Sequence, residues 1–133
     1  MFGKLALAPM GPSHVKKALK IINQHDDEDA EWAEKTYDKS LANQFVYKKG
    51  GRVLGVTGYS EDRDTVWISW TYVDKSQQGN SYGRQMLTAL LDLLIERGFR
   101  KAFVSTSDYR EAPSKPMLYD KAISLYKKLG FLL

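Results

Sequence analysis

The segment from residue 65 to residue 97 constrains the fold of this chain more than any other. Residues 65–73 are rich in β-branched and aromatic side chains, which is typical of a strand. Residues 85–97 carry leucines at helical spacing, and Gly98 marks a helix end. The intervening loop reads Gln78, Gly79, Asn80, Ser81, Tyr82, Gly83 and Arg84. The sequence therefore predicts a strand, a turn and a helix in succession.

A loop of this composition at the start of a helix can bind an anion. The first turn of a helix has N–H groups without partners and a partial positive charge, and glycine lets the backbone approach a phosphate. Arg84 adds a fixed positive charge. The loop lacks both the Gly-Lys-Ser/Thr of a Walker loop and the G-x-G-x-x-G of a dinucleotide site. Taken alone, it also fits an ordinary strand-to-helix turn.

Patterns in the rest of the chain predict a mixed sheet. Gly50-Gly51 between two strand-like runs predicts a hairpin. The predicted strands span residues 4–8, 45–49, 52–60, 65–73 and 101–106, and the predicted helices span about residues 11–22, 30–41, 85–97 and 118–129. This β-α-α-β-β-β-α-β-α order predicts an α/β fold (a mixed α+β sheet) of about five to six strands, with helices on both faces.

Composition narrows the class of protein. The 133 residues predict a single domain over 1–133. The absence of cysteine excludes thiol chemistry, and His14 and His25 alone predict no metal centre. No apolar run approaches the ~20 residues of a membrane span and no signal peptide is evident, so we expect a cytoplasmic protein. Residues 25–38 hold seven acids and one base in a chain of net charge +4, and the basic remainder suits a polyanionic partner.

Two motifs together resemble the GNAT N-acetyltransferase superfamily. Its signature Gln/Arg-x-x-Gly-x-Gly/Ala is matched by Gln78, Ser81 and Gly83, with serine in place of the first glycine. A later helix of the family typically reads A-x-x-L-Y-x-x-L-G-F, and here the matching residues are Ala122, Leu125, Tyr126, Leu129, Gly130 and Phe131. The resemblance covers residues 43–131 well and the N-terminal third in outline.

The resemblance implies acetyl-coenzyme A as cosubstrate, no metal, and a primary amine of a small molecule or peptide as acceptor. In this family the strand before the loop, here residues 65–73, carries a bulge and separates from the next strand, here 101–106, to admit the pantetheine arm. The main chains of Tyr72 and Val73 would contact the pantetheine, and the Val73 N–H would polarise the thioester carbonyl. Main-chain N–H groups of Gln78, Gly79, Asn80, Ser81, Tyr82, Gly83 and Arg84 would hold the pyrophosphate. Tyr126 would be the general acid toward the departing thiolate.

Alternatives remain open at two of these residues. Ser81 suits the loop if its backbone is near a helical conformation, and suits it less if a positive φ is required. Tyr126 also fits plain core packing, because Leu125 and Leu129 flank it at helical spacing.

The sequence says less about the residues that would bind and deprotonate the acceptor amine. The strand over residues 65–73 has no carboxylate, so the general base is left open between a water held by Ser69 or Thr71 and a carboxylate from the acidic segment. In this family that segment usually borders the acceptor site, and we expect it to attract a cationic amine. The acids concerned are Asp26, Asp27, Glu28 and Asp29. A solvated helix start, whose acids match the helix dipole, is the alternative interpretation.

Few residues follow Gly130-Phe131, where the family normally continues into two further strands. An uncovered strand edge and apolar helix face invite association, so we expect a homodimer or a larger assembly. A catalytically degenerate GNAT-like module, which binds coenzyme A or a protein partner, is the alternative function. A nucleic-acid-binding domain ranks last, because the basic residues are scattered without a recognition helix or an aromatic RNA platform.

Overall fold

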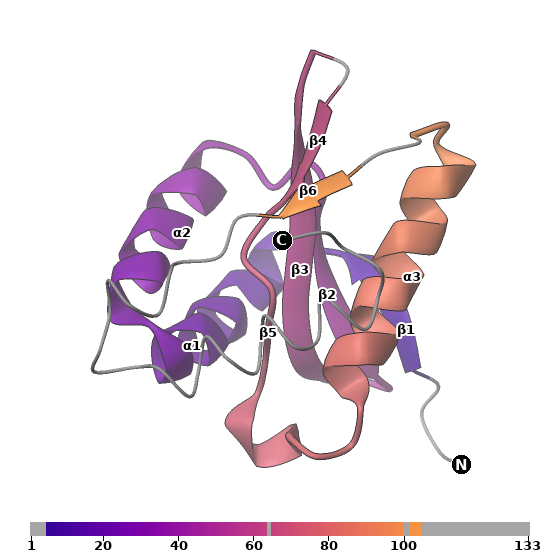
Figure 1. Ribbon diagram of the computed structural model, residues 1–133. Helices are drawn as coiled ribbons and strands as arrows, with labels where there is room; N and C mark the ends of the chain where they lie inside the picture. Colours follow the sequence, from indigo (N-terminus) through magenta and orange to yellow (C-terminus); the bar gives the residue numbers. More distant parts are fainter. Residues whose placement is uncertain (1–4, 64, 100–101, 105–133) are drawn as a thin grey trace, which may run out of the picture.

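A six-stranded mixed sheet forms the centre of the part of the chain that the structure describes (Figure 1). The computed structural model describes residues 5–63, 65–99 and 102–104. Successive strands β1 to β4 pair antiparallel, β5 pairs antiparallel with β3, and β6 runs parallel to β4. The strands are β1 (Leu5–Pro9), β2 (Gln44–Lys49), β3 (Arg52–Asp62), β4 (Thr65–Ile68), β5 (Tyr72–Val73) and β6 (Ala102–Val104). The predicted mixed sheet is confirmed.

The β2–β3 hairpin turns where the glycine pair predicts it. Lys49 lies opposite Arg52, and Gly50 has a φ of 61°, a left-handed conformation that glycine adopts without strain. This hairpin sets the register that places Val46 opposite Val56 in the middle of the sheet. The predicted hairpin is therefore confirmed.

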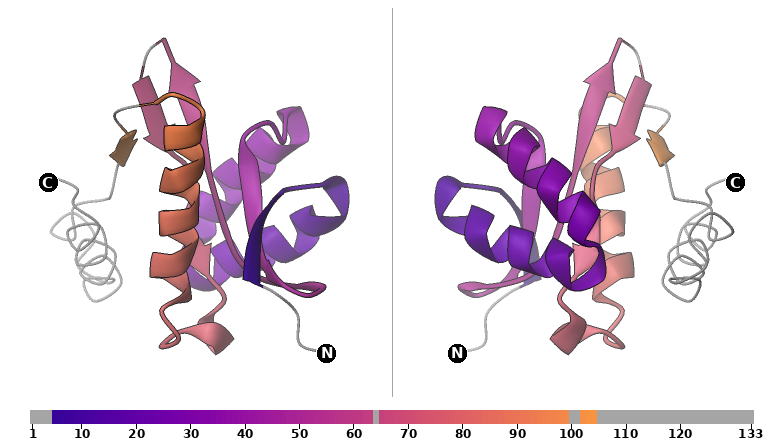
Figure 2. Two further views of the ribbon diagram at one scale, coloured as in Figure 1. Left: turned by 90° about the vertical axis from the view of Figure 1, so that its right-hand side faces the viewer. Right: turned by 90° about the vertical axis from the view of Figure 1, so that its left-hand side faces the viewer.

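Helices cover both faces of the sheet (Figure 2). A short 3-10 turn, η1 (Pro12–His14), leads into α1 (Val15–His25), and α2 (Asp27–Lys39) follows on the same face. Helix α3 (Tyr82–Glu96) lies on the opposite face. The two-faced arrangement and the predicted element order are confirmed as far as β6, and the helix predicted over 118–129 lies outside the described residues.

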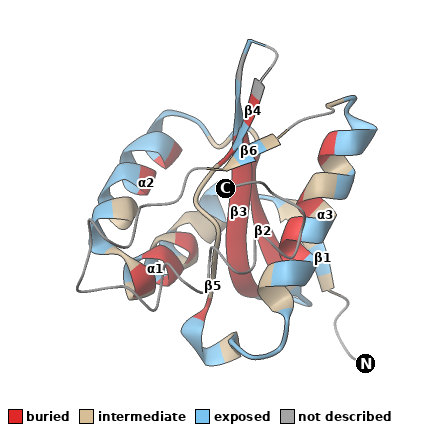
Figure 3. Cartoon of the chain, in the orientation of Figure 1, coloured by how far each residue is buried: buried red, intermediate tan, exposed pale blue. Residues whose placement is uncertain are grey.

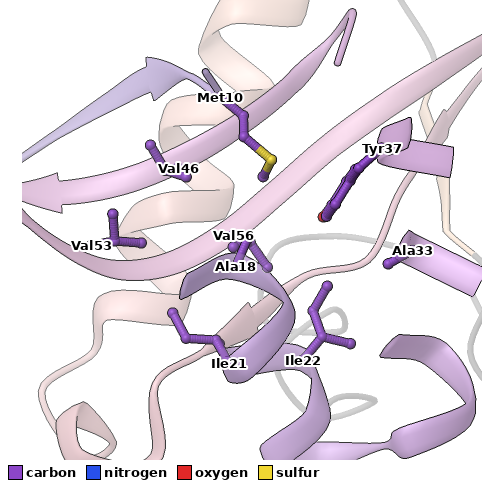
Figure 4. Close-up of a cluster of buried hydrophobic side chains, with 9 residues drawn as sticks. All are labelled: Met10, Ala18, Ile21, Ile22, Ala33, Tyr37, Val46, Val53 and Val56. Atoms are coloured by element: carbon purple, nitrogen blue, oxygen red, sulfur yellow. The ribbon is translucent and has the colours of Figure 1, made fainter. Parts of the chain in front are cut away.

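Two apolar cores hold these layers together, one on each side of the sheet. Figure 4 shows the core between the sheet and helices α1 and α2, where Ile21 and Ile22 of α1 pack beside Val46 and Val56. The second core joins α3 to the sheet through Phe45, Tyr59, Val66, Ile68, Leu87, Leu90 and Leu94. The central part of β3 is buried on both faces because it contributes to both cores (Figure 3).

Helix α3 begins and ends close to its predicted limits. It starts at Tyr82 rather than at residue 85, so part of the glycine-containing loop is the first helical turn. It ends before Gly98, which has a φ of +90° and donates its N–H to the carbonyl of Ile95 at 3.0 Å. The Phe99 N–H bonds the carbonyl of Leu94 at 3.0 Å. Gly98 is thus the helix stop that the sequence predicts.

The single strand predicted over residues 65–73 is wrong in its middle. Ile68 lies opposite Tyr59 and Tyr72 opposite Val56, so residues 69–71 face only two residues of β3. This extra residue is a β-bulge, which the family resemblance implies for this strand. The Ser69 N–H bonds the Gly58 carbonyl at 2.8 Å, and the Thr71 hydroxyl bonds the Ser69 carbonyl at 2.9 Å. One of these bonds crosses to β3 and the other lies within the bulge, so the regular ladder is interrupted between β4 and β5.

Candidate functional site

The loop after β5 leads directly to the start of α3. The 3-10 turn η2 (Lys75–Gln77) follows Asp74, Gly79 has a φ of 90°, and Asn80 donates from Nδ2 to the Gln77 carbonyl at 3.1 Å. The Gln85 N–H bonds the Ser81 carbonyl at 3.1 Å, which closes the first turn of α3. Among the described residues no side chain caps this helix start. No side-chain cap from this part of the chain therefore competes with an anion for the N–H groups of the first turn.

The backbone conformation of Ser81 shows which conformation the loop has at the position of the signature glycine. Its φ of 62° and ψ of 20° are left-handed, so the loop has a conformation that favours glycine. A non-glycine residue in this region costs roughly 1–2 kcal/mol. The loop keeps its shape with serine, and the chain bears that strain at the junction between loop and helix.

The main chain of Val73 faces away from the neighbouring strand β3. Val73 lies opposite Gly55, and the Asp74 N–H bonds the Leu54 carbonyl at 2.8 Å. Hydrogen-bonded and non-hydrogen-bonded positions alternate along an antiparallel pair, so Tyr72 directs its N–H and carbonyl toward β3 and Val73 directs its own outward. Of the two residues predicted to bind pantetheine through the backbone, Val73 thus has the orientation that such binding needs.

His25 contacts this strand, and sequence reasoning missed it. The His25 side chain is buried, and its Nε2 donates to the Val73 carbonyl at 2.7 Å, which requires the Nε2–H tautomer. Its ring stacks on that of Tyr72 with centroids 4.9 Å apart. Burial lowers the pKa of His25 below its ordinary 6.5, against the opposing effect of the hydrogen bond to Val73. His25 is therefore neutral at neutral pH and fixes the outer edge of β5.

The acidic segment divides into residues with different contacts. Asp26 is the N-cap of α2 and accepts the N–H groups of Glu28 at 3.0 Å and Asp29 at 3.1 Å. Its role is the structural one that the alternative interpretation describes. The Tyr72 hydroxyl donates to the Asp29 carboxylate, which ties α2 to β5. Asp27 and Glu28 lie exposed in the first helical turn.

Sequence reasoning also missed a polar cluster that joins the buried Asp74 to the partly exposed Lys17 and Gln24. Asp74 comes directly after β5, while Lys17 and Gln24 lie on one side of α1, two turns apart. That helical spacing was a visible signal, but nothing local in the sequence connects α1 with residue 74.

Some of the predicted features lie wholly or partly outside the described residues. Tyr126 lies outside the described residues, and the strand predicted over 101–106 is described at Ala102–Val104 alone. Within the described ranges no three acidic or histidine side chains are grouped so as to hold a metal ion. None of the helices described is long and apolar enough to cross a membrane.

Comparisons with known proteins assign the family. The model of the acetyltransferase (GNAT) family matches residues 14–131. The chain therefore belongs to the acetyltransferase (GNAT) family, as the two motifs indicate. A search of curated proteins found no match.

Solved structures share the fold. The ribosomal-protein-S18-alanine N-acetyltransferase from Escherichia coli is 22% identical with a TM-score of 0.75, covering 97% of this chain and 78% of that one. A GNAT family acetyltransferase from Brucella melitensis in complex with acetyl-CoA is 16% identical with a TM-score of 0.66, covering 82% and 81%. The GNAT family N-acetyltransferase YhbS from Escherichia coli, in complex with CoA, is 20% identical with a TM-score of 0.73, covering 98% and 70%. At these identities the likeness shows the fold.

Proposed function

We propose that the protein is an N-acetyltransferase that transfers an acetyl group from acetyl-coenzyme A to a primary amine of a small molecule or peptide. The observation that carries this proposal is the pairing of an uncapped helix start at Ser81 with the outward-facing main chain of Val73, in a chain of the acetyltransferase family. Two solved proteins of the same fold, from Brucella melitensis and Escherichia coli, are complexes with acetyl-CoA and CoA.

The described residues fit a bound acetyl-coenzyme A. Its pyrophosphate would lie against the first turn of α3, where Gly83 has no side chain to obstruct an approaching phosphate and Arg84 is exposed. Its pantetheine arm would run along the outer edge of β5, where the Val73 N–H would meet the thioester carbonyl. Acetyl-coenzyme A supplies the activated acetyl group as a thioester.

In the proposed reaction the amine nitrogen attacks the carbonyl carbon of the thioester. A C–N bond forms and the C–S bond breaks, while the amine loses one proton and the departing sulfur gains one. We assign the delivery of that proton to Tyr126, because a phenol with an ordinary pKa of about 10 keeps its proton at neutral pH. This assignment rests on the family motif around Tyr126. The general base remains open between a water at residues 69–71 and a carboxylate of the acidic segment.

For the acceptor we propose a cationic amine, with Asp27 and Glu28 of α2 as the attracting charges. Reversing both charges with Asp27→Lys and Glu28→Lys is expected to raise the KM for a cationic amine and to leave the KM for acetyl-coenzyme A unchanged. An unchanged KM for the amine would count against these two acids.

The expected homodimer and cytoplasmic location are also part of this proposal. Trp67 and Phe103 of β4 and β6 stack with centroids 5.2 Å apart and expose 41% and 40% of their surface, which supports association through this region. Sedimentation that shows a stable monomer at micromolar concentration would contradict the homodimer.

Calorimetric titration with acetyl-coenzyme A tests the proposed cosubstrate. Gly83→Glu places a carboxylate in the first turn of α3, where the helix dipole favours it but a phosphate is repelled. Thr88→Glu adds the same charge at an exposed position further along α3 and is the matched control. We expect saturable binding by the wild type and by the control, and loss of binding in Gly83→Glu. No binding by folded wild-type protein would refute the proposed function.

Turnover of an amine panel with the wild type and Tyr126→Phe then tests catalysis. We expect Tyr126→Phe to bind acetyl-coenzyme A normally and to lose most of its kcat, because it lacks the proton that the sulfur needs. Full activity in Tyr126→Phe would remove this residue from the mechanism.

A catalytically degenerate coenzyme A-binding module is the second candidate function. The observation that favours it is Ser81, which departs from the signature glycine at a position where the loop has a positive φ. Tight binding of acetyl-coenzyme A without turnover of any amine would support this second candidate.

A further inference from the structure

Helix α1 contacts the segment that connects β5 to residues 78–84, which we call the phosphate-binding loop. Lys17, Ile21 and Gln24 are spaced i, i+4 and i+7, so they lie along one side of the helix. Ile21 is fully buried in the core, while Lys17 and Gln24 extend to Asp74 and Lys75. One side of α1 therefore spans both the apolar core and the beginning of the loop.

The Asp74 carboxylate accepts hydrogen bonds from three residues. Its Oδ2 lies 3.0 Å from Lys17 Nζ, and its Oδ1 lies 3.3 Å from Gln24 Nε2. The same Oδ1 accepts the N–H of Ser76 at 3.1 Å and the Ser76 hydroxyl at 3.0 Å. Asp74 is only 4% exposed, so every one of these donors faces a carboxylate that is nearly removed from water.

Main-chain bonds fix the same position. The Asp74 N–H bonds the Leu54 carbonyl at 2.8 Å, and the Asp74 carbonyl accepts the Gln77 N–H at 2.8 Å. The Gln24 amide contacts two consecutive residues, because its Oε1 also accepts the Lys75 N–H at 3.0 Å. The chain is thus held on both sides of the point where the strand becomes the loop.

A buried carboxylate at this position needs an explanation. Burial of a charge is unfavourable, and a negative charge near a phosphate-binding loop opposes the binding of an anion. Burial by itself would raise the pKa of Asp74, but the hydrogen bonds from Lys17, Ser76 and Gln24 hold it well below its ordinary range. The carboxylate therefore stays ionised, and the ion pair with Lys17 offsets its charge.

We propose that Lys17, Gln24 and Asp74 form a positioning clamp that holds the phosphate-binding loop in the conformation that acetyl-coenzyme A requires. The three are positioning residues, because they act on the loop and not on the reacting atoms. The inference rests on the proposed function, since it assumes that residues 78–84 bind the pyrophosphate. Only a carboxylate matches a site surrounded by donors, because an asparagine amide would direct its own N–H groups at them.

The test compares variants at Asp74 with wild-type protein by calorimetric titration. Two ligands are used, acetyl-coenzyme A and its nucleotide portion, 3′-phosphoadenosine 5′-diphosphate. Asp74→Asn is expected to weaken both by about 10-fold or more, because loss of a charge-assisted hydrogen bond lowers the population of the binding-competent loop. Lys20→Met, which removes an exposed charge from the same helix, is the matched control and is expected to bind both ligands normally.

Lys17 provides a second, independent comparison. Lys17→Met leaves the buried Asp74 carboxylate without its ion pair, so the double variant Lys17→Met/Asp74→Asn is expected to bind better than Lys17→Met alone. If Asp74→Asn does not fold, Gln24→Met serves in its place, because it removes the contacts to Asp74 and Lys75 and keeps the ion pair.

The outcomes separate this inference from the proposed function. A purely structural cluster would lower the melting temperature and leave the Kd of the folded variants unchanged, and that result would overturn the clamp. Weakening of acetyl-coenzyme A without weakening of the nucleotide portion would also overturn it, because the clamp acts on the phosphate side. If folded wild-type protein binds neither ligand, the proposed function fails and the clamp fails with it.

Discussion

Replacement of Ser81 by glycine tests the backbone argument at the start of α3. Ser81 has a φ of 62° and makes no capping hydrogen bond through its side chain, so glycine relieves the strain without the loss of a helix cap. The relief is roughly 1–2 kcal/mol, and the greater freedom of glycine in the unfolded chain takes back about 0.5–1 kcal/mol. Ser81→Gly is therefore expected to stabilise the protein by about 0.5–1 kcal/mol, or about 2–4 °C in Tm for a chain of this size.

Thermal or urea unfolding measures the effect, and Ser81→Ala is the matched control. Alanine removes the hydroxyl as glycine does but keeps the strain of a positive φ, so its stability is expected to stay at or below that of the wild type. Equal stabilisation by alanine and glycine would refute the reasoning from backbone strain, because the hydroxyl would then be the cause. Destabilisation by glycine would show that the left-handed conformation is not a cost at this position.

The remaining predictions concern pH and packing. The pKa of His25 in the folded protein lies below 6.5, so His25 is protonated first in the unfolded chain as the pH falls. The free energy of unfolding is therefore expected to decrease below pH 6.5, by at most ~1.4 kcal/mol per pH unit. Urea unfolding at several pH values should show a smaller decrease for His25→Gln than for the wild type. Gly58→Ala would place a Cβ 2.7 Å from a main-chain oxygen and is expected to cost about 1–3 kcal/mol in urea unfolding, whereas Gly51→Ala, which has open space, serves as the control. Leu90→Ala should cost about 2–5 kcal/mol because Leu90 is fully buried, and the exposed Ile95→Ala should cost far less; equal losses would contradict the assignment of the core.

Features determined by nearby residues could be predicted from the sequence. Gly50 supplies the left-handed turn of the hairpin, and Gly98 ends α3 in the same way. The leucine spacing of α3 indicates which face is buried, since one face of a helix repeats every three to four residues. These signals lie within a few residues of the structure that they specify.

Features determined by distant partners could not be predicted. Lys17 and Asp74 are far apart in the sequence, and only the packing of α1 beside β5 brings them together. The same holds for His25 and the Val73 carbonyl. At Ser81 local preference favours a helical or extended backbone, and the junction between loop and α3 overrides it. The motif thus located the candidate site, while the contacts that hold it in place came from the rest of the fold.

The bulge at residues 69–71 has a consequence for the side-chain alternation of the strand that it interrupts. Ile68 packs in the core beneath α3, and with regular alternation Tyr72 would point to that same face. The one extra residue inverts the phase, so Tyr72 instead lies opposite Val56 on the α1 side, where it stacks on His25. Deletion of a single residue from 69–71 would remove the bulge, because two residues would then face two; Tyr72 would stay opposite Val56, and β4 and β5 would join into one regular strand. A change of one residue in chain length, without any change of residue type, would therefore remove the irregularity that the family resemblance implies for this strand, while the outward N–H of Val73 would be kept.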